Sequence, residues 1–253
     1  MAYDIIGNIA ILKFPAGTGS REKVKLAEKI LKEQKNVTTV LEKKEKVSGR
    51  LRTIKTRYLA GIKTKEAIYN ESGCKFKLDV EKCYFSPRLS GERLEIAKRC
   101  SKNDKVLVLF SGVAPFSVII GKRAKCRKIV SVELNRIASK YAMENIKLNK
   151  LNNIQIVQGD VAKLSKLIKV EKYDRIIMPR PQLKETFLKY IWRFSKKGTE
   201  VFYYDFGKDI NLILKKVERE AKKSRKKIKI LEFRKAGDIA PYKYRFLVRF
   251  EVN

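Results

Sequence analysis

The middle of the chain contains the stretch that decides the fold, Val106-Leu107-Val108-Leu109-Phe110-Ser111-Gly112-Val113-Ala114-Pro115-Phe116. Its first five residues are all apolar, which is typical of a strand buried on both faces in a parallel sheet. Ligands bind to open α/β sheets where such strands end. The stretch therefore predicts a central strand of a doubly wound α/β sheet, with a candidate ligand site directly after it.

Strands and helices alternate on both sides of this stretch, as in a doubly wound sheet. The further predicted strands are residues 129–132, 154–157, 176–178 and 201–204. The predicted helices are residues 89–100, 136–148, 183–194 and 209–222. Two late strands, 228–231 and 244–252, with 236–241 between them, predict an antiparallel hairpin at the edge of the sheet.

The chain before residue 85 has a different pattern. Residues 5–12 predict two strands and a turn, and residues 21–34 have helical spacing of apolar side chains. Short alternating runs then predict antiparallel strands with one solvated face, at residues 37–40, 51–54, 67–69 and 74–78. We therefore expect a small α+β domain over residues 1–85 and an α/β domain over residues 86–253.

The charge of the chain implies a polyanionic partner. Lys and Arg number 60 against 27 Asp and Glu, so the net charge is +33. A charge of this size points to RNA, DNA or an anionic surface. The absence of histidine excludes a Ser-His-Asp or Cys-His relay and a His-ligated zinc. Any proton must therefore be taken by a carboxylate, Lys, Tyr or water.

Metal, membrane and secretion signals are missing from the sequence. The four cysteines are Cys74, Cys83, Cys100 and Cys126, and no two of them form a C-x-x-C pair, so we expect no metal site. No apolar run reaches the roughly 18 residues of a membrane helix, and we expect no membrane association. Because no signal peptide follows Met1, we expect a cytoplasmic protein with reduced thiols.

The residues at the strand ends predict a nucleoside ligand without phosphates. Gly112 is the only glycine of its turn, so neither a G-x-G-x-x-G motif nor a P-loop is present to bind a pyrophosphate. Glu133 ends the second strand, where an acid bonds ribose hydroxyls in such folds. Asp160 follows the third strand and could hold an adenine amino group. The ordered set predicts S-adenosylmethionine, although Glu133 alone could also be a solvated charge at a strand end.

The fourth strand ends in Met178-Pro179-Arg180-Pro181. Many methyltransferases that act on a nucleic-acid nitrogen carry an Asn/Asp-Pro-Pro type of loop at this corner. Two prolines stiffen such a loop and aim its carbonyls at an amino group. The alternative is an ordinary loop between a strand and a helix.

Two motifs stand out, Tyr84-Phe85-Ser86-Pro87-Arg88-Leu89-Ser90-Gly91-Glu92-Arg93 and the turn 110–116. Together with residues 3–10, 56–61 and 240–242, they resemble the archaeal and eukaryotic tRNA (guanine-37-N1)-methyltransferases. The resemblance implies a small tRNA-contacting domain before a Rossmann-like class I methyltransferase domain. It implies methyl transfer from S-adenosylmethionine to N1 of guanine 37, in the anticodon arm of tRNA, by an enzyme that we expect to be a monomer.

Two departures qualify this resemblance. Val108 stands where the family often has Asp, and Met178-Pro179-Arg180-Pro181 stands where it often has Asn-Pro-Pro. The variant is similar to an archaeal subgroup linked to wyosine biosynthesis, some members of which also methylate C7 of 4-demethylwyosine. The chain starts directly at the second domain of the longer members. The alternatives are an aminocarboxypropyl transferase with the same cofactor and a non-catalytic RNA-binding protein.

The resemblance also assigns roles to residues. Arg88 is expected in the active site, where it could bond guanine O6, and Asp104 is the candidate base for the N1 proton, with a plain turn residue as its alternative. Glu133, Pro179 and Pro181 complete the expected catalytic set. The expected cofactor-binding residues are Arg88, Phe110, Gly112, Val113, Glu133, Leu134, Asp160, Val161 and Met178. The expected RNA-binding residues are Arg50, Arg52, Lys55 and Arg57 along one predicted strand, with Tyr84, Arg180 and Lys184.

Overall fold

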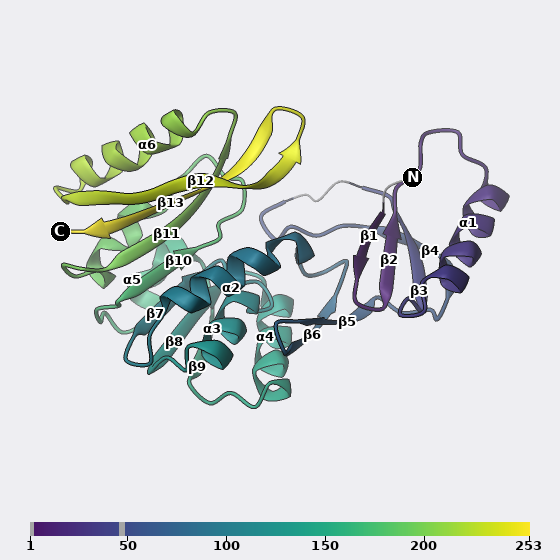
Figure 1. The fold of residues 1–253 in the computed structure, drawn as a ribbon, viewed down its shortest axis with the longest axis horizontal. Helices are drawn as coiled ribbons and strands as arrows, with labels where there is room; N and C mark the ends of the chain where they lie inside the picture. Colours follow the sequence, from purple (N-terminus) through teal and green to yellow (C-terminus); the bar gives the residue numbers. More distant parts are fainter. Residues whose placement is uncertain (1–2, 46–48) are drawn as a thin grey trace.

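The computed structural model describes residues 3–45 and 49–253 and contains a small N-terminal sheet beside a larger α/β part (Figure 1). The small sheet has the strand order β1-β2-β3-β4 and is covered on one face by helix α1. Its elements are β1 (Tyr3–Ile6), β2 (Ile9–Leu12), α1 (Ser20–Glu33), β3 (Thr39–Lys43) and β4 (Thr56–Gly61). Ala27 and Ile30 of α1 pack against Val40 of the sheet and form its own apolar core.

A hairpin of two strands, β5 (Glu66–Glu71) and β6 (Cys74–Asp79), follows the small sheet. The side-chain amides of Asn145 and Asn149 on helix α4 (Arg136–Leu148 with Asn149 as its cap) bond both backbone groups of Lys77 and Lys75, at 2.7–3.1 Å. The two amides act as a substitute for a neighbouring strand at the edge of β6. The hairpin is thereby fixed to the α/β part.

The turn between β1 and β2 packs closely against this hairpin. Gly7 has a φ of +57°, and a Cβ on it would lie 1.8 Å from the carbonyl oxygen of Ile68. The Asn8 side chain accepts a hydrogen bond of 2.8 Å from the amide of the same Ile68. The small sheet therefore contacts β5 through a turn that only glycine can form.

The large sheet has seven strands in the order β12-β13-β11-β10-β7-β8-β9. The five strands β11, β10, β7, β8 and β9 are parallel to one another. At the other edge, β13 pairs antiparallel with both β11 and β12. The strands are β7 (Lys105–Leu109), β8 (Lys128–Glu133), β9 (Ile154–Gln158), β10 (Arg175–Met178), β11 (Glu200–Gly207), β12 (Ile228–Ala240) and β13 (Lys243–Val252). The predicted α/β sheet and its late edge hairpin are confirmed.

Helices cover both faces of the large sheet (Figure 1). They are α2 (Ser90–Arg99), α3 (Pro115–Arg123), α4, α5 (Leu164–Leu167) and α6 (Ile210–Lys223). Alternate residues of the central strand enter separate cores: Val106 and Val108 pack on the side of α2 to α4, while Leu107 and Leu109 pack on the side of α5 and α6. Burial of the central strand on both faces explains its unbroken apolar sequence.

Three predicted segments differ from the structure. Residues 183–194 form a loop with two short 3-10 turns instead of a helix, because the buried guanidinium of Arg180 binds the carbonyls of Leu183 and Glu185. Residues 51–54 form no regular strand, and Arg52 has a φ of +56°. Residues 236–240, predicted as a connection, belong to β12, which accommodates them with bulges.

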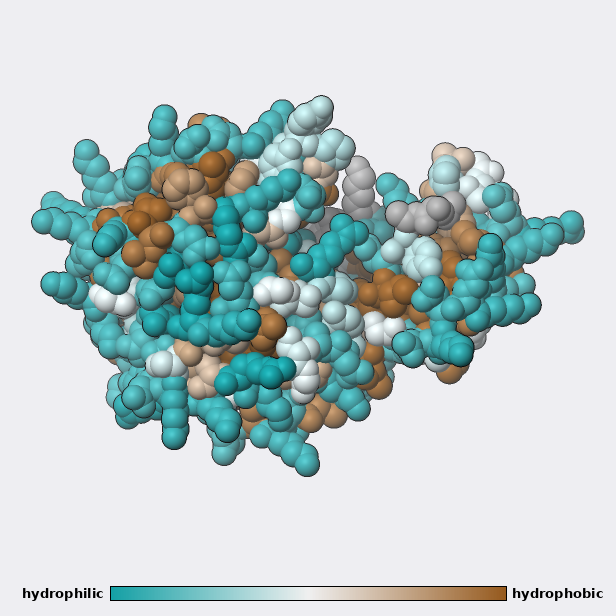
Figure 2. Space-filling model, in the orientation of Figure 1, coloured by the Kyte–Doolittle hydropathy of each residue, from teal (hydrophilic) through white to brown (hydrophobic). Residues whose placement is uncertain are grey.

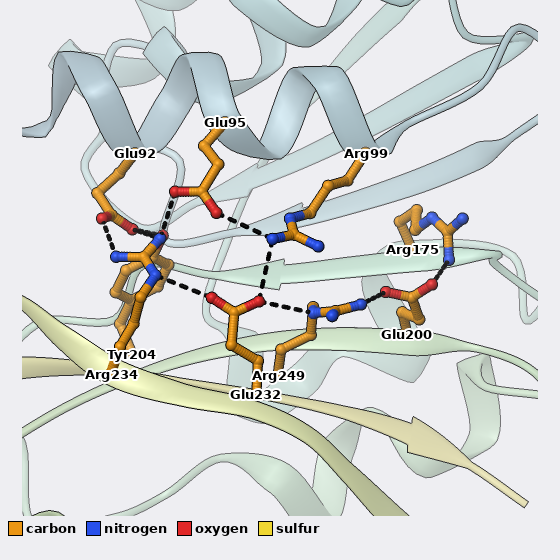
Figure 3. Close-up of polar contacts among 9 residues, drawn as sticks. All are labelled: Glu92, Glu95, Arg99, Arg175, Glu200, Tyr204, Glu232, Arg234 and Arg249. Atoms are coloured by element: carbon orange, nitrogen blue, oxygen red, sulfur yellow. Dashed lines mark hydrogen bonds and ion pairs between the residues drawn. The ribbon is translucent and has the colours of Figure 1, made fainter.

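A network of arginines and carboxylates ties the edge hairpin to helix α2 (Figure 3). Arg234 of β12 bonds both Glu92 and Glu95 of α2, and Glu92 also accepts a hydrogen bond of 2.7 Å from the Tyr204 hydroxyl. The remaining members are Arg99, Arg175, Glu200, Glu232 and Arg249. Since each charge has several partners, the network fixes the start of α2, which lies directly after the segment that contributes Tyr84 to the candidate site.

Candidate active site

A pocket opens at the carboxyl ends of β7, β8, β9 and β10, where ligands bind in this type of sheet. It is lined by residues from four strand ends, by the segment before α2 and by a loop of the N-terminal part. The lining residues are Arg50, Leu51, Arg52, Tyr84, Phe85, Ser86, Leu89, Arg93, Phe110, Ser111, Gly112, Pro115, Phe116, Glu133, Leu134, Asn135, Ala138, Asp160, Val161, Pro179, Pro181, Leu183 and Phe187. The pocket thus contains six residues of the expected cofactor set, namely Phe110, Gly112, Glu133, Leu134, Asp160 and Val161.

The loop after β7 has an unusual backbone. Phe110, Gly112 and Ala114 all have positive φ values, of 56°, 57° and 64°. Two of these residues are not glycine, so the loop stores conformational strain of the kind that is common at binding sites. The strained turn aims the amide of Gly112 at Glu133, to which it donates a hydrogen bond of 2.7 Å.

Glu133 is held by backbone amides rather than by cations. Its second carboxylate oxygen accepts a hydrogen bond of 2.8 Å from the amide of Asn135, the residue that caps α4. Burial raises the pKa of the Glu133 carboxyl above its ordinary value, although these amide hydrogen bonds oppose the change. The arrangement leaves a fixed acceptor in the pocket that suits the hydroxyls of a ribose.

Asp160 lies across the pocket and has one long-range partner. One of its oxygens accepts from the amide of Ala162, and the other bonds Arg50 at 2.7 Å. Burial would raise the pKa of Asp160, but the amide and the guanidinium outweigh it and lower the pKa. Asp160 is therefore an ionised acceptor at the edge of the pocket.

Tyr84 forms the border between the pocket and a second, larger groove. The guanidinium of Arg52 lies 3.5 Å from the centre of its ring, and Arg245 of β13 approaches its hydroxyl at 3.5 Å. The groove runs between the small sheet and the end of the β12–β13 hairpin, and Figure 2 shows the molecule hollowed between its two parts. Both cavities are lined by Arg52, Tyr84, Phe85 and Ser86, so the two lie side by side and share a wall.

The pocket fits a polar ligand without phosphates. Ser111 is 4% exposed, and its hydroxyl has no hydrogen-bond partner within the described part of the chain, although the residue lines the pocket. A buried hydroxyl of this kind is normally satisfied, so a ligand atom would complete it. Pro179 and Pro181 also line the pocket, beside Phe187, and supply a stiff apolar wall.

Sequence reasoning missed the buried pair of Arg93 and Glu71. Arg93 is 1% exposed, lines the pocket, and bonds Glu71 of β5 through two nitrogens and the carbonyl of Ser86 through one of them. The signal was present in the sequence, because Arg93 stands four residues after Leu89 on the face of α2 that points to the core. A charged residue at such a position indicates a buried ion pair.

The prediction of Asp104 as the base is wrong. Asp104 precedes β7 and therefore lies at the amino end of the sheet, opposite the pocket. Its carboxylate accepts hydrogen bonds from the amide and hydroxyl of Ser101, both at 2.9 Å, and pairs with Arg175 at 3.3 Å. It acts as a turn residue, which was the alternative interpretation.

Three other predicted residues point away from the pocket. Met178 and Val113 are fully buried in the apolar cores and do not line it. Arg180, expected to bind RNA, is 1% exposed and pairs with Asp205 of β11. Its role is structural, because it holds the loop after β10 in place.

Arg88 lines the groove rather than the pocket, and it pairs with Asp4 of β1 at 2.8 Å. Its predicted contacts with the cofactor and with the target base both stay predictions. The expected row of basic residues on one strand does not form. Arg50 and Arg52 reach the pocket from a turn, while Lys55 and Arg57 pair with Glu45 and Glu42 at 3.1 and 2.8 Å. Lys184 is exposed in the loop after β10.

Residues 3–45 and 49–253, which the structure describes, lack both a metal-binding group and a membrane-spanning helix. They contain no group of three or more carboxylates and cysteines placed to hold a metal ion. They also contain no helix with the length and apolar character needed to cross a bilayer.

The strand order and the position of the pocket define a Rossmann-like sheet of the class I methyltransferase type. Residues 67–231 match the TRM5/TYW2 methyltransferase domain, and residues 1–64 match the TYW2 N-terminal domain. The chain therefore belongs to the TRM5/TYW2 methyltransferase family, which confirms the resemblance seen in the sequence.

Three known proteins illustrate this relationship. The tRNA (guanine(37)-N(1))-methyltransferase Trm5b of Pyrococcus abyssi is 36% identical, over 100% of this chain and 75% of the relative. The tRNA (guanine(37)-N(1))/4-demethylwyosine(37)-methyltransferase Taw22 of Nanoarchaeum equitans is 33% identical, over 98% of both chains. The solved complex of aTrm5 with tRNALeu superposes with a TM-score of 0.88 at 31% identity, over 100% of this chain and 72% of that one.

Proposed function

We propose that this enzyme transfers the methyl group of S-adenosylmethionine to N1 of guanine 37 in tRNA. The observation that carries the proposal is the pocket at the strand ends, in which Glu133 and Asp160 face a site without a phosphate cradle. The full-length similarity to a tRNA (guanine(37)-N(1))-methyltransferase supports the same reaction. The complex of a relative with tRNA supports the substrate.

The residues that hold the cofactor in this proposal come from three strand ends. Glu133 accepts hydrogen bonds from the ribose, Asp160 binds the adenine edge, and Phe110 and Val161 contact the rings. Ser111 supplies a hydroxyl for a polar group of the ligand. The cofactor, when bound, supplies an electrophilic methyl on a sulfonium, so no metal is needed to activate it.

The target guanine enters from the groove. Tyr84 lies where the pocket and the groove meet, and its ring can stack on a base that has been turned out of the anticodon loop. Arg88, on the groove side, can bond O6 and stabilise the negative charge that develops there when N1 loses its proton. Arg52 has to leave the ring of Tyr84 before the base can stack, and RNA phosphates offer it an alternative partner.

Four carboxylates that line the pocket or the groove are the candidates for the proton acceptor, since Asp104 lies at the opposite end of the sheet. Within the described part of the chain, Glu133 and Asp160 line the pocket, and Asp4 and Asp238 line the groove. Replacing each in turn by its amide and recording the pH dependence of kcat identifies the base, because its loss removes the acidic limb of the profile.

A second substrate is supported by a specific observation. A relative that aligns over 98% of both chains is named for both guanine 37 and 4-demethylwyosine 37. We propose that the same pocket can also accept the tricyclic base. The chain is proposed to act as a monomer, since residues of one chain line the pocket on all of its described sides.

The experiment uses the whole chain with S-adenosylmethionine and two transcripts of a phenylalanine tRNA, with guanine or adenine at position 37. Nucleosides are analysed by mass. N1-methylguanosine in the first transcript alone is the expected result. A product that carries the mass of an aminocarboxypropyl group, or no product when cofactor binding is intact, would contradict the proposal.

A variant within the pocket tests the cofactor site, and a variant outside it provides the control. Glu133→Gln keeps the size of the side chain and loses the ionised acceptor. We expect at least about a tenfold loss of affinity for S-adenosylhomocysteine in calorimetry, since hydrogen bonds to charged groups are each worth about 1.5–3 kcal/mol. Because burial raises the pKa of Glu133, wild-type affinity should fall as the pH drops through that raised value, and the profile of the variant should be flat. Asp104→Asn, at the opposite end of the sheet, should bind the cofactor normally.

A further inference from the structure

The end of the β12–β13 hairpin is not used by the site described above. The two strands pair as far as Ala240 and Lys243, so the chain turns at Pro241 and Tyr242. In Figure 1 this end projects from the large sheet toward the small one. Tyr242 is 76% exposed and Ile239 beside it is 42% exposed. An apolar turn in this position contributes nothing to a core.

Tyr242 also has an unfavourable backbone for its type. Its φ is +56°, a value at which glycine or asparagine is the usual choice, and an ordinary residue there costs about 1–2 kcal/mol. No described residue forms an aromatic or cation–π pair with its ring. Tyr244, two residues further on, has both: it packs edge-on against Phe246 and lies 3.9 Å below the ammonium of Lys235. A two-residue turn with Pro241 in its first position requires a positive φ in its second, and glycine would satisfy this at no cost. Tyrosine at that position therefore presents an exposed ring at an energetic cost that glycine would avoid.

The hairpin end lies at a strongly basic groove. Residues 236–239 line that groove together with the segment that contains Tyr84 and Arg88. Its cationic lining residues are Lys13, Lys43, Arg52, Arg88 and Arg245, and its acidic ones are Asp4 and Asp238. A surface with an excess of positive charge beside exposed aromatic rings is the arrangement that binds single-stranded nucleic acid. The groove also shares a wall with the pocket, so RNA that fills the groove lies next to a base bound in the pocket.

The hairpin is held as a fixed arm. Arg234 anchors its root to Glu92 and Glu95 of α2, and three bulges re-aim β12 before the turn. Bulges of this kind occur next to functional sites, where they direct a side chain. A base that stacks on Tyr242 would therefore meet a ring that is already in position.

We propose that the turn of the β12–β13 hairpin is a base-stacking element, in which Tyr242 covers an unpaired base of the tRNA loop that occupies the groove. Extrusion of the target base leaves a neighbouring base with one open face, and an aromatic ring compensates for the lost stacking. This inference rests on the proposed function, because the loop that supplies the base is the one that contains guanine 37.

The test measures the affinity of the full chain, saturated with S-adenosylhomocysteine, for an anticodon stem-loop RNA by fluorescence anisotropy. Stacking on one base contributes about 1–3 kcal/mol, so Tyr242→Ala should bind about 5- to 100-fold more weakly. Tyr242→Phe keeps the ring and should bind within about twofold of wild type. Leu212→Ala is the matched control, since Leu212 is an equally exposed apolar residue (64%) on α6.

The dependence on salt separates stacking from charge. Tyr242→Ala should lower the affinity without changing the slope of log affinity against log salt, because no phosphate contact is lost. Arg88→Ala should reduce the magnitude of that slope by about 1, because one phosphate contact is lost. A further variant, Tyr242→Trp, should show quenching of its indole fluorescence when the stem-loop is added, whereas buried Trp192 should not respond.

The outcomes distinguish the inference from the function on which it rests. If wild type binds and methylates tRNA and Tyr242→Ala does the same with unchanged affinity, the stacking role is overturned and the function stands. If wild type neither binds the stem-loop nor methylates tRNA, the proposed function fails and the inference fails with it.

Discussion

The ion pairs behind the pocket and those at its mouth are built differently. Behind the pocket, Arg93 and Glu71 are almost completely buried. Arg234 is partly exposed but shares three carboxylates, Glu92 and Glu95 of α2 and Glu232 of its own strand. At the mouth Arg50 meets Asp160, and in the adjoining groove Arg88 meets Asp4, each as a single pair with arginine side chains that are 60% and 74% exposed. Arg93 and Glu71 are shielded from water and salt, Arg234 is shielded in part, and the exposed arginines at the mouth and in the groove are not shielded.

The difference separates framework from binding surface. A buried pair cannot exchange its partner without leaving a charge unpaired, so the walls of the pocket keep their shape. An exposed pair gains little from its partner and can exchange a carboxylate for a phosphate at small cost. The arginines at the mouth are therefore available to RNA, while those behind it are not.

The largest effect is expected at the buried pair. Glu71→Gln leaves Arg93 buried without a counter-charge, and we expect a loss of about 3–5 kcal/mol in the free energy of unfolding, measured with urea. Glu66→Gln, on the same strand, removes a half-exposed carboxylate and should cost less than about 1 kcal/mol. A cost below 1 kcal/mol for Glu71→Gln would contradict the distinction between the buried ion pair and the exposed pairs.

A smaller effect is expected in the network of Figure 3. Arg234→Met loses bonds to Glu92, Glu95 and Glu232, and hydrogen bonds to charged groups contribute about 1.5–3 kcal/mol where water is excluded. Since the guanidinium is partly solvated, we expect a loss of about 1–2 kcal/mol. Arg219→Met, an exposed arginine on α6, is the control and should stay within about 0.5 kcal/mol. An equal loss of unfolding free energy in Arg234→Met and Arg219→Met would contradict a stabilising role for the network.

The pH dependence of stability tests a group of three charges at the amino end of the large sheet. Lys105 and Lys128 bond Glu171 and lower its pKa from 4.5 to about 2. A lowered carboxyl pKa stabilises the fold above pH 4.5, and this contribution is lost as the pH falls toward 2. Thermal unfolding of Glu171→Gln and wild type should therefore differ most above pH 5 and converge near pH 2. A difference in unfolding temperature between the two proteins that grows as the pH falls would contradict the lowered pKa of Glu171.

The smallest effect on stability is expected at the mouth of the pocket. Arg50→Ala and Arg88→Ala should each change the free energy of unfolding by less than about 0.5 kcal/mol at physiological salt. Both should nevertheless weaken tRNA binding in the same preparation. A double-mutant cycle of Arg88→Ala with Asp4→Ala should give a coupling energy of about 0–1 kcal/mol. A loss of stability without a loss of RNA affinity would show that these arginines stabilise the fold and do not bind RNA.

The sequence predicted the features that depend on local pattern. The apolar runs located every strand of the parallel sheet, and the strand ends located Glu133 and Asp160, because side-chain periodicity and the binding edge of such sheets follow general rules. Asp104 was placed wrongly although the same rule applied: a residue that precedes a strand lies at the amino end, away from the ligand.

The remaining errors came from contacts between distant residues. Arg180 pairs with Asp205, which is 25 positions later, and its carbonyl acceptors convert the predicted helix after Pro181 into a loop. Nothing within a local window distinguishes this arginine from the other basic residues of the chain. Arg50 likewise reaches Asp160 across 110 positions. Such pairs become visible only when the fold brings them together.

The bulges of β12 have a consequence for the protein at high concentration. β12 is the last strand of the sheet and is 13 residues long, so its outer side could serve as a template for pairing with another molecule. Three irregularities interrupt its hydrogen-bonding register, and Lys229 and Lys235 are exposed along it. An incoming strand would find no long, flat and uncharged ladder to join. The same bulges that direct the hairpin toward the groove thus protect the sheet from edge-to-edge aggregation.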